Sequence, residues 1–283
     1  MLKVWTNCRG PANGGTLPLP ERVVFGRDAR APYDPTVAGI LVITPHPDDE
    51  AYAFGGLLAI AADAGWEWAL ECATAGERGK RHDGGEPSHE ALGRDRLAEL
   101  ARSCAILGVS RPPRCWQLPD GGLAGERSQA DRIAQLIAEL QPELVLALGP
   151  DGAYGHPDHL TLYRWIAESW ETLADAAPVL LYAAFPKGLF VPQWEKCLGM
   201  LGEPPQPSRD EIGIERPDIA IRIEEVAARK LAAIGAHRSQ LPDGDPLAIF
   251  PPGIVAGTLR EEWYNVGGGR NDAEVLSMLL PGN

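Results

Sequence analysis

The sequence predicts an α/β protein, a single Rossmann-like domain in which a mainly parallel sheet carries helices on both faces. Three observations lead to this prediction. Short apolar segments rich in β-branched residues, such as AGILVIT at 38–44, are typical of strands buried on both faces. Such segments alternate with helical segments from 38 to 185, as in proteins with parallel sheets. No clear linker or fixed repeat divides the 283 residues, which are enough for one large core.

The first part of this domain is expected to run strand, helix, strand, helix, strand. After the strand at 38–44, AYAFGGLLAIAADAG at 51–65 has the small and apolar residues of a tightly packed helix and ends at a glycine. EWALECATA at 67–75 predicts the second strand. The helical periodicity of 88–108 also stops at a glycine, and RCWQLPD at 114–120 is a short strand candidate.

The second part continues the alternation and then changes character. Residues 126–141 have the pattern of an amphipathic helix that stops before Pro142, and ELVLALGP at 143–150 predicts another buried strand. The remaining expected segments are a helix at 156–176, a strand at 178–185, a Pro-rich stretch at 186–217 and a late helix at 223–240.

Composition limits what lies outside and around this domain. Residues 1–37 are rich in Gly, Pro and charge, so we expect an irregular N-terminal arm before one domain at 38–283. The formal net charge of −13 opposes binding to nucleic acid, which needs a positive surface. No apolar run is long enough to span a membrane, and the N-terminus lacks the apolar core of a secretory signal. The sequence therefore predicts a cytoplasmic protein and leaves open whether it forms a homo-oligomer.

Polar residues that can bind a metal follow the first strand. HPDDE at 46–50 begins with a histidine and continues to three acids. If the turn after the proline is helical, His46 and Asp49 share a face and can bind one divalent ion. Asp48 then points elsewhere and can accept a proton from a metal-bound water. Acids at a helix start also favour the helix dipole, but this structural explanation does not account for His46.

A second polar motif follows the strand at 143–150. GHPDH at 155–159 supplies His156, Asp158 and His159, and its proline suits the first position of a helix. The two histidines are three residues apart and can face one cleft, where a helix start keeps their rings neutral. A capped helix with exposed histidines explains this motif equally well when it is taken alone. Because ligands bind at the carboxyl ends of parallel strands, the two motifs together favour one shared metal centre.

The pair of motifs, PHPDDE at 45–50 and GHPDH at 155–159, resembles the LmbE-like or PIG-L family of zinc-dependent N-acetylglucosamine deacetylases. The resemblance runs from about residue 38 to about residue 265. Weaker matches are ATAGERG at 73–79, RLAEL at 96–100, AHRSQ at 236–240 and REEWY at 260–264. The resemblance implies hydrolysis of an N-acetyl group, with release of acetate, from a small N-acetylglucosamine-type glycoside or conjugate.

The resemblance also implies roles for individual residues. The implied metal ligands are His46, Asp49 and His159. Asp48 would be the general base on the metal-bound water, and His156 an electrostatic stabiliser or general acid. Tyr154 would donate a hydrogen bond to the oxyanion, and Asp158 would orient a histidine beside the metal. Three protein ligands leave a position open for water, as catalytic zinc requires, and ferrous iron also accepts two histidines and a carboxylate.

Further residues are candidates for substrate contact or for support of the site. Glu77, Arg78 and Arg96 are expected near the substrate, although surface or structural ion pairs also explain the two arginines. His237 matches a late family motif and is expected to support the site, although a cation at a helix end explains it too. His82 lies in a polar loop and is interpreted as a solvated side chain.

Two other functions are compatible with the same residues. An amidase acting on a thiol conjugate or another amide would share the metal site and differ in its pocket. A noncatalytic sugar-binding protein on the same fold would be expected to lack the ligands or the base, yet all are present. A dinucleotide-binding oxidoreductase is disfavoured, because HPDDE stands where GxGxxG would follow the first strand.

Overall fold

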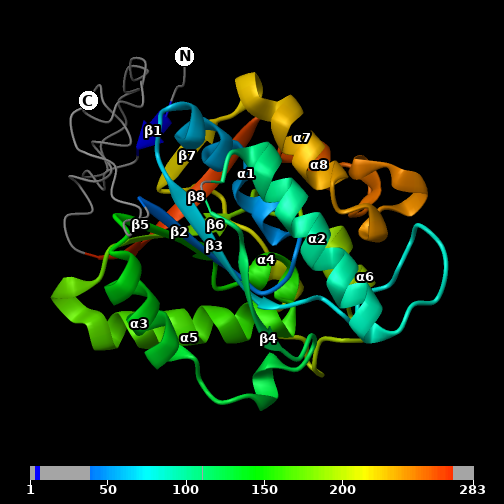
Figure 1. The fold of residues 1–283 in the computed structure, drawn as a ribbon, viewed down its shortest axis with the longest axis horizontal. Helices are drawn as coiled ribbons and strands as arrows, with labels where there is room; N and C mark the ends of the chain where they lie inside the picture. Colours follow the sequence, from blue (N-terminus) through cyan, green and yellow to red (C-terminus); the bar gives the residue numbers. More distant parts are fainter. Residues whose placement is uncertain (1–3, 7–38, 110, 270–283) are drawn as a thin grey trace.

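The computed structural model describes residues 4–6, 39–109 and 111–269 and shows an α/β architecture (Figure 1). Its sheet has eight strands in the order β1-β7-β8-β6-β5-β2-β3-β4. In chain order the strands are β1 Val4–Thr6, β2 Ile40–Thr44, β3 Trp68–Thr74, β4 Arg114–Leu118, β5 Leu144–Leu148, β6 Val179–Ala184, β7 Ile219–Arg222 and β8 Glu261–Gly268.

The five strands predicted from the sequence form the parallel half of the sheet. β4, β3, β2, β5 and β6 are neighbours in this order and pair in parallel. Every residue of β2, β3, β5 and β6 is buried, which explains why their sequences are apolar runs rather than alternating patterns. The chain leaves β2 toward β3 and β4 and returns to β5 on the opposite side. Ligands bind outside the carboxyl ends of strands at such a switch point.

Helices cover both faces of this sheet, as predicted. The longer helices are α1 Asp49–Asp63, α2 His89–Leu107, α3 Ala130–Leu140, α5 Pro157–Leu173 and α7 Ala227–Gly235, and the short ones are α4 Gly152–Gly155, α6 Val191–Lys196 and α8 Ile254–Gly257. α1, α2 and α7 pack together on one face, and α3 and α5 on the other. Alternate strand residues enter the two cores: Ile40 and Val42 face the first cluster, Leu41 and Ile43 the second. In the described ranges, no helix is long and apolar enough to cross a membrane.

The antiparallel part of the sheet was not predicted from the sequence. β8 pairs antiparallel with β6, β7 pairs antiparallel with β8, and β1 pairs antiparallel with β7. The expectation of an irregular segment at 1–37 falls mostly outside the described residues, but Val4–Thr6 within it is a strand. The helix expected at 223–240 is shorter, because three-residue 3₁₀ turns replace its two ends.

Candidate metal centre

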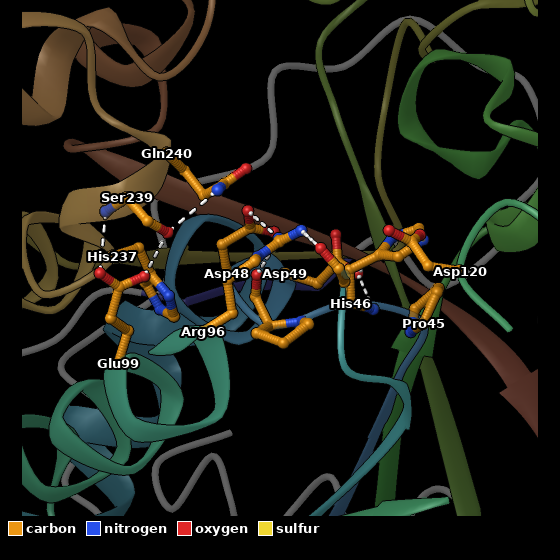
Figure 2. A network of polar contacts seen from close by, with 12 residues as sticks. Pro45, His46, Asp48, Asp49, Arg96, Glu99, Asp120, His237, Ser239 and Gln240 are labelled. Atoms are coloured by element: carbon orange, nitrogen blue, oxygen red, sulfur yellow. Dashed lines mark hydrogen bonds and ion pairs between the residues drawn. The ribbon is translucent and has the colours of Figure 1, made fainter. Parts of the chain in front are cut away.

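The two histidine motifs meet at the carboxyl edge of the parallel strands. His46 follows the end of β2 by two residues, and His156 and His159 follow β5 through the short helix α4. Asp120 reaches the same place from the end of β4, and Figure 2 shows it beside His46. The side chains of three strand ends therefore form one site, where the sequence predicted a shared centre.

A strained turn between β2 and α1 positions the first motif. The backbone N–H of Thr74 in β3 donates to the carbonyl of Pro45, which anchors the turn to the neighbouring strand. The backbone N–H of His46 donates to Asp49 Oδ2 at 2.9 Å, so the histidine and the acid face each other. Asp48 has φ 120°, a left-handed conformation that a non-glycine residue adopts only when its surroundings hold it.

The side chains of His46, Asp49 and His159 lie close together, and a different oxygen of Asp49 faces each histidine. His46 Nδ1 lies 3.2 Å from His159 Nε2 and 3.6 Å from Asp49 Oδ2, and His159 Nε2 lies 3.5 Å from Asp49 Oδ1. Donor atoms around a tetrahedral zinc ion with bonds near 2.0–2.1 Å lie about 3.3 Å apart. The spacing and the chemistry of these three donors therefore fit a tetrahedral ion such as zinc.

The other nitrogen of each of the two rings has its own hydrogen-bond acceptor. His46 Nε2 lies 3.2 Å from Asp158 Oδ2 and 3.2 Å from Asp120 Oδ1, and His159 Nδ1 lies 3.0 Å from the carbonyl of Gly152. Such contacts fix the tautomer and leave the opposite nitrogen free to bind a metal. Asp158 is held in place because its two oxygens accept the backbone N–H groups of Gly121 at 2.7 Å and of residue 123 at 3.0 Å.

The charge states of these groups reflect their burial and their neighbours. Burial lowers the pKa of His159 to about 4, so its ring is neutral at pH 7. Burial opposes a charge on His46, but hydrogen bonds with Asp120, Asp158 and Asp49 raise its pKa well above the ordinary value. Without a cation, these carboxylates attract a proton to His46, and a bound metal would replace that proton.

The side chain of Asp48, next to Asp49 in the chain, pairs with Arg96. The Arg96 guanidinium donates to Asp48 Oδ2 at 3.0 Å and to the carbonyls of Pro47 and Gly76 at 2.7 Å each (Figure 2). Burial raises the pKa of Asp48 to about 6, although Arg96 pulls it down. Gly76 has φ 64°, and a Cβ there would lie 2.2 Å from Arg96 Nη1. The loop after β3 needs a glycine at this position to pack on the guanidinium.

Tyr154 and His156 form the opposite wall of the site. Tyr154 lies at a kink in α4 and stacks on Phe190, with ring centroids 6.0 Å apart, while its edge meets the rings of His156 and His159. The backbone N–H of Asp158 donates to His156 Nδ1 at 3.2 Å, which leaves the ring proton on Nε2. Burial lowers the pKa of His156 to about 2 and raises that of Tyr154, so both side chains are neutral.

A buried charge pair supports the strained turn from behind. One oxygen of Glu50, Oε2, accepts the backbone N–H of Asp48 at 3.0 Å. The other, Oε1, lies 2.7 Å from His237 Nε2 and accepts the hydroxyl of Ser103. Because His237 is fully buried, its contact with Glu50 explains its place beside the site.

A neighbouring network ties the late motif to α2. Glu99 accepts the backbone N–H of Ser239 at 2.8 Å and its hydroxyl at 2.6 Å, and Gln240 donates to the same hydroxyl (Figure 2).

A cavity of about 400 Å³ opens in front of these groups. Its floor includes His46, Asp48, Tyr154 and His156. Arg78 and Arg96 also line it. The remaining metal-ligand candidates, Asp49 and His159, are buried behind this floor.

Asp120 was not predicted, and Glu50 was noted only as one of three acids at a helix start. Glu77, a candidate for substrate contact or for support of the site, does not line the cavity and accepts the backbone N–H of Asp120 at 2.9 Å. Asp120 in turn accepts the backbone N–H of Arg78 at 2.8 Å. Glu77 therefore supports the loop that carries Arg78.

Comparison with known proteins agrees with this geometry. The family described as PIG-L, GlcNAc-PI de-N-acetylase, matches residues 41–170, which contain both histidine motifs. A 1D-myo-inositol 2-acetamido-2-deoxy-alpha-D-glucopyranoside deacetylase of Nakamurella multipartita is 31% identical over 239 residues, which cover 72% of this chain and 80% of that protein. The chain belongs to the PIG-L family of deacetylases. A second PIG-L relative, a probable N-acetyl-alpha-D-glucosaminyl L-malate deacetylase 2 of Bacillus cereus, is 30% identical over 205 residues, or 71% of this chain and 83% of that one.

Solved structures extend the likeness at the level of the fold. GalB, the 4-carboxy-2-hydroxymuconate hydratase from Pseudomonas putida KT2440, has a TM-score of 0.59 at 21% identity and covers 82% of this chain and 96% of its own. At this identity the likeness shows the fold alone, and one fold hosts different reactions. The PIG-L relationship, rather than the fold, makes the chain a member of an amide-hydrolase family, as the sequence predicted.

Proposed function

We propose that this chain is a metal-dependent deacetylase that removes the acetyl group from an N-acetylglucosamine-type glycoside or conjugate and releases acetate. The observation that carries the proposal is the convergence of His46, Asp49 and His159 at 3.2–3.6 Å, with Asp48 beside them on the cavity floor. The PIG-L family relationship supports the class of reaction, and the names of the relatives support the class of substrate.

His46, Asp49 and His159 would hold the ion, zinc or ferrous iron. When bound, it would polarise the acetamide carbonyl and lower the pKa of a neighbouring water. Two contacts keep the donors in place for this purpose. Tyr52 donates its hydroxyl to Asp49 Oδ1 at 2.8 Å, and Asp158 holds His46 through Nε2.

Asp48 is the proposed general base. Its pKa of about 6 leaves it mostly ionised at pH 7 yet basic enough to accept a proton from the attacking water. The water oxygen bonds to the acetamide carbon, and a tetrahedral intermediate forms. Asp48, now protonated, returns the proton to the leaving nitrogen as the C–N bond breaks. The products are acetate and the free amine of the sugar.

Tyr154 and His156 are the proposed donors to the oxyanion. Both side chains are neutral and line the cavity. The donor on Tyr154 is its hydroxyl, and the donor on His156 is the N–H at Nε2. Donors fixed before the reaction stabilise developing charge without reorganisation. The low pKa of His156 favours this role over that of a general acid, the other role that the sequence left open.

Acetate release tests the proposal. Zinc-loaded protein is incubated with N-acetylglucosamine, its inositol and malate glycosides, an N-acetylated disaccharide and an N-acetylated thiol conjugate. We expect release from at least one glycoside, loss on chelation, and loss of most activity with retained zinc in Asp48→Asn. Release only from the thiol conjugate would favour the alternative amidase. No release from any compound by protein that holds its metal would refute the proposal.

A further inference from the structure

The mouth of the cavity differs in charge from its floor. Two acids line the cavity: Asp120, 3.2 Å from His46 Nε2, and Asp48, which pairs with the buried Arg96. The rim carries Arg78, Lys80 and Lys196, together with His82. The chain as a whole has a formal net charge of −13, so a group of cations without acids is unusual on its surface.

Three of the rim residues come from one loop, the segment between β3 and α2. Arg78, Lys80 and His82 are exposed, whereas the residues between them are half-buried. All three line the cavity. Arg81, which does not line it, forms ion pairs with Asp83 and with an acid of α2 at 2.6 Å. The cation of the loop that does not line the cavity is therefore neutralised.

The rim side chains that line the cavity lack such partners. Within the described ranges, the side chains of Arg78, Lys80, His82 and Lys196 have no hydrogen bond or ion pair. Acids are nearby in sequence, but they are used elsewhere: Glu195, next to Lys196, pairs with an arginine at 3.2 Å. Among the described residues, no acid pairs with the charged side chains of the rim.

Two backbone hydrogen bonds fix the loop in place beside the cavity. The backbone N–H of Arg78 donates to Asp120 at 2.8 Å, and that of His82 donates to the carbonyl of Ser239 at 2.7 Å. Lys196 reaches the rim from the end of α6, a separate element. Partial burial lowers the pKa of His82, and the charges of Lys80 and Lys196 lower it further; all three side chains line the same cavity.

We propose that Arg78, Lys80, His82 and Lys196 form a binding subsite for an anionic group, a carboxylate or a phosphate, on the part of the substrate that does not react. The inference rests on the proposed function, because it places the acetamide at the floor and the remainder of the glycoside at the mouth. Cations placed close together repel one another, and a bound anionic group offsets this repulsion. Lys80 and Lys196 are the specificity-determining residues that we assign to this subsite.

The test compares glycosides that differ only in the charge of the aglycone. The zinc-loaded protein is assayed with N-acetylglucosaminides that carry a neutral polyol, a carboxylate and a phosphate. The variants are Lys80→Gln, Lys196→Gln and the double variant, with Arg102→Gln as control. Arg102 is an exposed cation on α2 outside the cavity lining, so its replacement removes the same charge from another place.

We expect the wild-type protein to prefer an anionic aglycone. Each lysine replacement should raise KM for that substrate about threefold, and the double variant should raise it about tenfold. The value of kcat should be retained, because exposed charge contacts of this kind are made equally in the ground state and the transition state. The neutral glycoside and the Arg102→Gln control should stay within about twofold of the reference values. Comparison of the carboxylate with the phosphate identifies which anion the rim accepts.

Three outcomes would overturn the inference. Equal kcat/KM for neutral and anionic glycosides would remove the anionic subsite and leave the deacetylase activity intact. Equal losses with Arg102→Gln would show a general effect of net charge rather than a subsite. No acetate release from any glycoside would refute the proposed function, and the subsite with it.

Discussion

Arg96 should set the pH at which the enzyme becomes active. It donates three hydrogen bonds at 2.7–3.0 Å, and one of them goes to the carboxylate of Asp48. Arg96 is 4% exposed, so solvent screens its charge only weakly. Replacing it with glutamine removes the positive charge beside the proposed base and should raise the pKa of Asp48.

The size of the effect follows from the geometry. An opposite charge within 4–6 Å lowers a carboxyl pKa by about 1–3 units, and the lower limit is a cautious choice here. Starting from a pKa of about 6, loss of Arg96 should move Asp48 to about 7. The ionised fraction at pH 6 then falls from about one half to about one tenth, a roughly fivefold loss that disappears near pH 8. A bound metal would shift the pKa of Asp48 equally in the wild type and in Arg96→Gln. The prediction is therefore the difference in pKa between the two proteins.

The assay is the pH profile of kcat/KM for acetate release by wild type, Arg96→Gln and Arg96→Lys, each checked for zinc content. The lysine variant keeps the charge and loses the planar fork, so its acidic limb should move by less than about half a unit. A limb that stays unchanged in Arg96→Gln, or that moves equally in both variants, would refute the assignment of Asp48 as the base controlled by Arg96.

Three further predictions concern the support of the site. Asp158→Asn should weaken zinc binding about 10–100-fold, measured by competition with a chromophoric chelator, because the imidazole that it orients loses a charged acceptor; unchanged affinity would exclude this role. Glu50→Gln should lower the free energy of unfolding in urea by about 3–5 kcal/mol, because it leaves a buried histidine without its counter-charge, whereas Glu90→Gln in an exposed pair should change it by less than about 1 kcal/mol. Gly76→Ala should destabilise the protein more than Gly85→Ala, because both have positive φ but only the first meets a buried guanidinium; equal losses would contradict this packing.

The parallel half of the fold was predictable because its signals are local. Strands β2, β3, β5 and β6 are buried on both faces, and strands of this kind have sequences that are largely continuous apolar runs. The antiparallel strands lack this signal. β8 alternates between half-buried and buried residues only in its first four positions, and β7 has only four residues, so neither stands out without its partner.

The candidate site also combines residues that lie in short local motifs with contacts between residues far apart in sequence. His46, Asp49, His156 and His159 lie in two short motifs, and the parallel sheet brings both motifs to one edge. The contact between Glu50 and His237 was not predicted, because the two residues are 187 positions apart in sequence.

Asp120 and the two lysines of the rim were not predicted for a related reason, although Arg78 was expected near the substrate. Asp120 contacts His46 only because β4 and β2 end at the same edge of the sheet. Nothing in the segment around it marks that contact. The cationic rim joins a loop after β3 to the end of α6, a relation that no local pattern contains.

Titration of zinc into protein from which a chelator has removed the metal tests most directly the claim that this chain is a metal-dependent deacetylase. Bound zinc and the rate of acetate release from an N-acetylglucosaminide are measured in the same samples. The structure predicts that both rise together and saturate at one equivalent per chain, and that His159→Ala lowers both. Acetate release that persists after chelation, or undiminished zinc binding by His159→Ala, would contradict a metal-dependent deacetylase built on these ligands.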